Sequence, residues 1–89
     1  MYLHLGSDVA VRTADIVTVC DLDNASASHI TRSFLRSAQE ADRVVNVAED
    51  LPKSFVVCAP PEGGLTVYLS QLNSATLLKR AAEQTQIPE

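Results

Sequence analysis

Three arginines recur at helical spacing in the middle of the chain: Arg32, Arg36 and Arg43. At 100° per residue their side chains fall within about 40° of one another on a helical wheel. Guanidinium groups spaced one turn apart can follow the phosphates of a nucleic acid. A solvated helix face that keeps a protein soluble gives the same pattern. The spacing alone therefore leaves both interpretations open.

Side chains suited to catalysis are scattered along the chain. The sequence contains no glycine-rich phosphate loop, no nucleophile signature around a serine or cysteine, and no two-histidine metal spacing. His29 lies where a helix is expected to begin and should be exposed, whereas His4 lies in a predicted strand and could sit at a subunit contact. Six carboxylates fall at predicted turns and strand ends, where solvated acids are common: Asp8, Asp15, Asp21, Asp23, Glu49 and Asp50. We predict no enzymatic activity, no cofactor and no small-molecule substrate.

The two cysteines, Cys20 and Cys58, both lie in apolar runs. This placement predicts buried free thiols in a reducing compartment, because free cysteine behaves as a small hydrophobe. A metal site would need both histidines at spacings that match no zinc pattern, so no metal is expected. The N-terminus lacks a charged leader region, and no apolar run approaches the roughly 20 residues of a membrane span. We predict a soluble, cytoplasmic protein that does not bind membranes.

The composition limits the interactions of the whole surface. Seven Lys and Arg residues stand against 11 Asp and Glu, a net charge of −4, so any binding of nucleic acid needs a local basic patch. Hydrophobic residues make up 46% of the chain and aromatics 4%, which predicts a folded aliphatic core. A chain of 89 residues with this composition also favours self-association.

The N-terminal half predicts strands and one helix. Residues 2–5 and 9–12 have the pattern of two short strands. The break between them at Gly6, Ser7 and Asp8 predicts a hairpin. Residues 16–22 are apolar and β-branched at nearly every position, which predicts a strand in the middle of the sheet, covered on both faces. Capping residues at 23–28 then precede a helix of about four turns. Its predicted packing face consists of Ala27, Ile30, Phe34, Ala38 and Ala41.

The C-terminal half predicts a short strand, a hairpin and a helix. Residues 44–47 form the short strand, and residues 53–59 and 65–70 form the hairpin around two prolines and two glycines. The last helix begins near Asn73 or Ser74. Its inward residues should be Leu77, Leu78, Ala81 and Ala82.

These elements together predict an α+β fold. The expected architecture is a twisted, mainly antiparallel sheet of about five to six short strands, with a middle helix and a C-terminal helix. Residues 1–89 should form one domain, in which residues 86–89 are a frayed tail.

Four segments together resemble a known family: residues 1–6, 15–17, 52–57 and 72–80. The most specific parts are the opening Tyr-x-His-Leu-Gly and the closing Leu-x-Ser-x-Thr-Leu-x-Lys-Arg. The chain resembles the bacterial extracellular-matrix regulators RemA and RemB, specifically the RemB (YaaB-like) branch. The likeness covers nearly the whole chain, although the middle helix matches only in length and pattern.

The resemblance implies a small protein that assembles into ring-shaped homo-oligomers. In the RemA branch it implies a DNA-binding transcription regulator of biofilm-matrix genes. That branch carries an arginine just before the central strand and a basic cluster before the later hairpin. Asp15 stands at the first position here, and Lys53 is the single cation of residues 49–53.

Two functions follow as expectations from this resemblance. The first is a homo-oligomeric regulator that contacts the phosphates of double-stranded DNA through Arg12 and Lys53, near strand ends, together with Arg32, Arg36 and Arg43. The alternative is a non-enzymatic assembly or protein-interaction module that keeps the ring and lacks the DNA surface. The acidic net charge favours the alternative.

Overall fold

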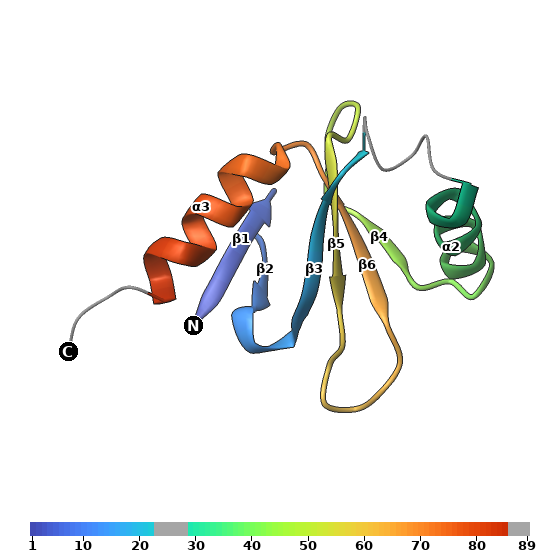
Figure 1. Ribbon diagram of the computed structural model, residues 1–89, viewed down its shortest axis with the longest axis horizontal. Helices are drawn as coiled ribbons and strands as arrows, with labels where there is room; N and C mark the ends of the chain where they lie inside the picture. Colours follow the sequence, from blue (N-terminus) through green and yellow to red (C-terminus); the bar gives the residue numbers. More distant parts are fainter. Residues whose placement is uncertain (23–28, 86–89) are drawn as a thin grey trace.

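In the part of the chain that the structure describes, four strands form a central sheet with a further layer on each side (Figure 1). The structure is a computed structural model that describes residues 1–22 and 29–85. In chain order the elements are β1 (Tyr2–Gly6), β2 (Val9–Arg12), the 3-10 turn η1 (Thr13–Asp15), β3 (Ile16–Asp21), α2 (His29–Glu40), β4 (Val44–Asn46), β5 (Ser54–Cys58), β6 (Thr66–Ser70) and α3 (Ser74–Thr85).

The strand order of the central sheet is β3-β5-β6-β4. Strand β5 is antiparallel to both β3 and β6, and β4 is parallel to β6. The β1–β2 hairpin forms a second sheet, which lies with α3 on one face of the central sheet, while α2 lies on the other face (Figure 1). The α+β prediction is confirmed, and the six strands found among the described residues are divided between two sheets.

Strand β5 is the centre of the fold, and all five of its residues are buried. Its side chains alternate between two cores because successive residues of a strand point to opposite faces. Val56 and Cys58 face the core made by the N-terminal hairpin and α3. Phe55 and Val57 face the core beneath α2.

Strand β3 lies at an edge of the sheet, so the prediction of a central strand over residues 16–22 was wrong. The Val17 side chain is 60% exposed, and the register shifts between Ile16 and Thr18. An apolar, β-branched run indicates a strand that packs well, but it does not indicate where that strand lies in the sheet. The pairing partners decide its place, and here β5 lies between β6 and β3.

The middle helix is confirmed, but its packing face differs from the prediction. Phe34 and Ala38 pack against the sheet as expected, joined by Leu35. Ile30 is 79% exposed, and Ala41 lies beyond the end of the helix. The predicted contact of Ala27 and the capping residues 23–28 lie outside the described residues.

The C-terminal hairpin and helix are confirmed. The Asn73 side-chain oxygen accepts a hydrogen bond from the Thr76 N–H at 2.8 Å, which caps α3 as the sequence predicts. Leu77 is fully buried, but Leu78 is 53% exposed, so the predicted inward face was too wide.

Two buried serines join the separate parts of the fold. Ser54 and Ser70 face each other across β5 and β6, and both are 0% exposed. The Ser70 hydroxyl donates to the Leu5 carbonyl at 2.7 Å and accepts from the Leu72 N–H at 3.1 Å. The Ser54 hydroxyl donates to the Leu72 carbonyl at 2.7 Å. These bonds link the N-terminal hairpin, the sheet and the entrance to α3.

Candidate nucleic-acid interface

Arg43 lies outside α2, so the predicted helical stripe of three arginines does not form. The helix ends at Glu40, and Asp42 adopts a positive φ of 60° that turns the chain. Arg32 and Arg36 remain exposed on α2. This ending is hard to predict, because no glycine or proline marks it in the sequence.

The turn carries Arg43 to one end of the central sheet. Its carbonyl accepts the Val67 N–H at 2.8 Å, and its exposed guanidinium lies against Gly64 in the β5–β6 loop. A Cβ atom at position 64 would overlap the guanidinium, and Gly64 also has a positive φ of 77°. The positive φ favours glycine there, whereas the flexible guanidinium could move away from a Cβ atom.

Arg12 lies at the same end of the sheet. The Asp15 carbonyl accepts the Ala59 N–H at 2.7 Å, so η1 sits against the start of the β5–β6 loop. The Arg12 Nε is 3.9 Å from the Asp15 carboxylate, and the Arg12 side chain is 51% exposed. Arg12 and Arg43 therefore flank one loop, although they lie 31 positions apart in the sequence.

Lys53 lies at the opposite end of the sheet. Its N–H donates to the Ser70 carbonyl at 2.8 Å, and its carbonyl accepts the Leu22 N–H at 3.0 Å, beyond the last residue of β3. At about 3.3 Å per residue, the length of β3 separates Lys53 from Arg12 by roughly 20 Å. One protomer does not bring these two predicted phosphate contacts together.

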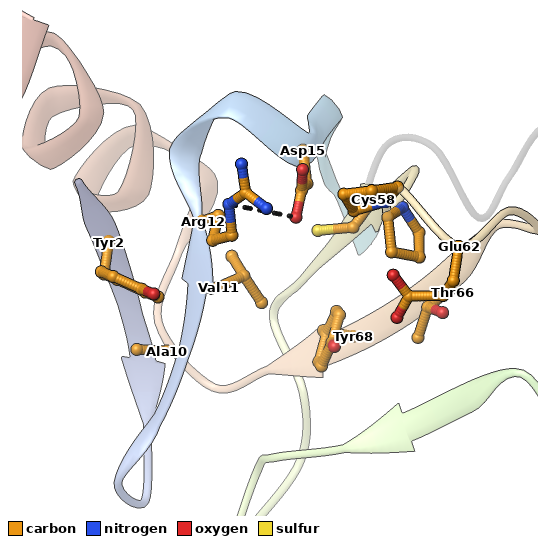
Figure 2. Close-up of a pocket in the computed structure, with 11 residues that line it drawn as sticks. Tyr2, Ala10, Val11, Arg12, Asp15, Cys58, Glu62, Thr66 and Tyr68 are labelled. Atoms are coloured by element: carbon orange, nitrogen blue, oxygen red, sulfur yellow. Dashed lines mark ion pairs between the residues drawn. The ribbon is translucent and has the colours of Figure 1, made fainter.

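A cavity of about 390 Å³ lies between the N-terminal hairpin and the β5–β6 hairpin (Figure 2). Polar groups that line it include Tyr2, Arg12, Asp15, Glu62 and Tyr68. Figure 2 shows the Arg12 guanidinium directed at the Asp15 carboxylate, with the Cys58 sulfur beside them.

Two carboxylates in the lining of this cavity, Asp15 and Glu62, lie near Cys58 and Tyr68. Burial, together with the Asp15 charge, raises the pKa of Cys58 from 9.0 to about 11. Burial and the charges of Cys58, Asp15 and Glu62 also raise the pKa of Tyr68. A protonated thiol is a poor nucleophile, so Cys58 acts as a packing residue at neutral pH.

The raised pKa of Cys58 predicts an alkaline loss of stability. An unfolded chain releases the thiol proton near pH 9.0, whereas the folded chain keeps it until about pH 11. The free energy of unfolding should therefore fall as pH rises through this window, and Tyr68 adds to the fall in the same direction. Urea titrations at pH 8 to 11 measure it. Cys58→Ala should show a shallower decline, and an unchanged decline would contradict the assignment.

Other predicted features have mixed outcomes. Both cysteines are free; Cys58 is buried as predicted, but Cys20 is only half-buried. His29 is exposed as expected, and His4 is exposed as well. Within residues 1–22 and 29–85, no three His, Cys, Asp or Glu side chains are grouped so as to hold a metal ion. The described helices include none with the length and apolar character to cross a membrane.

Comparison with known proteins shows the family to which this chain is related. The family model described as "Extracellular matrix regulatory protein A-like" matches residues 2–81. This chain belongs to the RemA-like family. It is also 41% identical over 81 residues to the extracellular matrix regulatory protein B of Bacillus subtilis (strain 168), which covers 91% of this chain and 90% of that protein. The resemblance to the RemB branch of the RemA-like family is thus confirmed.

Within this RemA-like fold, the sequence did not reveal that Arg12 and Arg43 lie at the same end of the sheet, on either side of the β5–β6 loop. This placement depends on β3 pairing with β5 and on β4 pairing with β6, which no local pattern reveals.

Proposed function

We propose that this RemA-like chain is a homo-oligomeric, non-enzymatic regulator that binds DNA and controls extracellular-matrix genes. The observation that carries the proposal is the position of Arg12 and Arg43, two exposed guanidinium groups on either side of one loop at one end of the sheet. The name of the Bacillus subtilis relative, an extracellular matrix regulatory protein, supports the regulatory part.

Arg12 is available to a phosphate despite its neighbour Asp15. The distance of 3.9 Å between the Arg12 Nε and the Asp15 carboxylate is long for an ion pair, and the Arg12 side chain is half exposed. An exposed ion pair of this kind contributes little, at most about 1 kcal/mol, so a phosphate oxygen can replace the carboxylate. Arginine also presents two parallel N–H groups to a phosphate, which makes it a better contact than a lysine.

The remaining basic residues are less well placed to contact DNA phosphates in this proposal. Lys53 lies three residues after Asp50 in the sequence, close to two acidic residues, and at the far end of the sheet. Arg32 and Arg36 lie on the exposed side of α2 and are secondary contacts. Two arginines per chain bind DNA weakly, but several copies acting together raise the overall affinity through high effective concentration.

The test is fluorescence anisotropy of a labelled DNA duplex at several salt concentrations. Affinity should fall steeply with salt, and Arg12→Ala and Arg43→Ala should each weaken binding. Each should also make the logarithmic salt slope shallower by about 0.9 for every phosphate contact removed. Lys79→Ala on α3 is the matched control that leaves binding unchanged. Greater losses in Lys53→Ala than in the two arginine variants would contradict the assignment of this end of the sheet.

A second candidate function is an assembly module that does not bind DNA. It is supported by the Arg12–Asp15 contact, which lowers the free positive charge, and by the net charge of −4. The same titration separates the two functions. A stable oligomer with no measurable DNA binding at low salt selects the assembly module and rejects the first proposal.

A further inference from the structure

The central sheet has two edges at which, among the described residues, a strand pairs on one side only: β3 and β4. Both edges carry exposed valines. Val17 in β3 is 60% exposed, and Val45 in β4 is 40% exposed. Unpaired edges with apolar side chains are sites where another strand can add to a sheet.

Uncharged grooves flank β3 on both faces, and the one beside α2 is almost wholly apolar. A groove of about 380 Å³ lies between β3 and α3, and its wall includes the half-exposed Leu78. A groove of about 350 Å³ lies between β3 and α2, and its wall includes Ile30 and Phe34. Both grooves share Val17 and Thr18, and none of the described residues that line them carries a charge. This surface fits a protein partner and does not fit a phosphate backbone.

We propose that the β3 edge of one copy receives the β4 edge of the next copy, so that the sheet continues from subunit to subunit. The inference rests on the homo-oligomeric part of the proposed function. The strand registers give the alignment. Val44, Val45 and Asn46 lie level with Thr18, Val19 and Cys20 across the sheet. The β4 strand of a second copy therefore lies beside Thr18, Val19 and Cys20, and Val17 lies at the start of the contact.

Charges at the ends of the two edges select the direction of this pairing. Arg43 precedes β4, and Glu49 and Asp50 follow it. Asp15 precedes β3, and Lys53 lies next to the end of β3. A parallel pairing places Arg43 beside Asp15, where Arg12 also lies, and places Glu49 and Asp50 beside Lys53. An antiparallel pairing places Arg43 beside Lys53, and Glu49 and Asp50 beside Asp15. Electrostatic complementarity therefore favours parallel strands.

The direction agrees with the order of the strands inside one copy. Strand β4 is parallel to β6, and β6 and β3 are both antiparallel to β5, so β4 and β3 point the same way. Repeating one copy along the sheet therefore produces the parallel contact without any inversion. Such a head-to-tail contact uses two different surfaces, and it closes into a ring when the rotation between neighbours allows it.

This contact brings the DNA-binding groups of neighbours together. Arg43 precedes β4 at the same end of the sheet at which Arg12 and Asp15 precede β3. In the assembly, Arg43 of one copy lies near Arg12 and Asp15 of the next. One carboxylate then faces two guanidinium groups, and the arginines of successive copies form a continuous rim.

The test uses two edge variants, Val17→Lys and Val45→Lys, studied by size exclusion with light scattering. Each introduces a charge at a partly exposed position, so each should fold and run as a monomer, with the dissociation constant of the contact raised about 100-fold or more. An equimolar mixture should form a heterodimer and nothing larger, because each variant keeps one intact edge. Leu65→Lys, in the β5–β6 loop at 42% exposure, is the control that stays oligomeric.

The outcomes separate this inference from the proposed function. A monomeric wild type rejects homo-oligomerisation itself. An oligomeric wild type whose two edge variants remain oligomeric rejects only the β3–β4 contact. Loss of assembly in Val17→Lys alone, with no heterodimer in the mixture, indicates symmetric β3–β3 pairing or a different partner surface and also overturns the proposal. If circular dichroism shows Val17→Lys to be unfolded, Val17→Thr keeps the β-branched shape and should still weaken assembly.

Discussion

Leu77→Ala should lower the free energy of unfolding by about 3 to 4 kcal/mol, within the usual range for a buried leucine. Leu77 is fully buried and packs in the core that joins α3 to Leu3, Leu5 and Val56. Removing its branched end leaves a cavity among three different elements, none of which can close it without losing other contacts. Urea unfolding followed by circular dichroism measures the change.

Leu78→Ala is the matched control for this prediction. Its side chain is 53% exposed on the same helix, so its replacement should cost less than about 1 kcal/mol. The two leucines have the same helix propensity and differ chiefly in burial. Equal losses in the two variants would mean that α3 packs on the hairpin through a different face.

Ser70→Ala should lower the free energy of unfolding by about 2 to 4 kcal/mol, a large effect for the loss of a single oxygen atom. The hydroxyl donates to Leu5 and accepts from Leu72, so its removal leaves two backbone groups without these bonds in a buried site. An unpaired buried polar group costs about 1 to 3 kcal/mol. Amide hydrogen exchange provides a second measurement, since the Leu72 N–H should exchange faster in the variant.

Ser33→Ala provides the comparison for Ser70→Ala. Ser33 is exposed on α2, so its replacement should change stability by less than about 0.5 kcal/mol. A loss in Ser70→Ala no larger than that of Ser33→Ala would show that water satisfies the Leu5 and Leu72 groups.

Local chemistry made the two hairpins and α3 predictable from the sequence. Gly6, Ser7 and Asp8 take positive φ values in the first turn, as their types allow. Gly63 and Gly64 do so in the β5–β6 loop, and Asn73 caps α3. Each of these features depends on a few neighbouring residues, which is why a pattern in the sequence is sufficient.

Long-range pairing decided what the sequence did not reveal. Residues 16–22 and β5 are both apolar runs, and only the position of β6 makes β5 central and β3 an edge. Arg43 left the predicted stripe because a single residue, Asp42, ends the helix in a left-handed conformation. The candidate interface could therefore be predicted as a set of basic residues but not as a surface, because the strand order decides which of these residues lie at the same end of the sheet.

The bond from Ser70 to Leu5 joins residues 65 positions apart, and the core around it unites the first strand with the last helix. During synthesis the N-terminal hairpin emerges long before its partners. Its apolar face, Leu3, Leu5 and Val11, stays uncovered until α3 has left the ribosome. Contacts of such high sequence separation slow folding, so the core around Leu3 and Leu5 is complete only once α3 can pack on the hairpin.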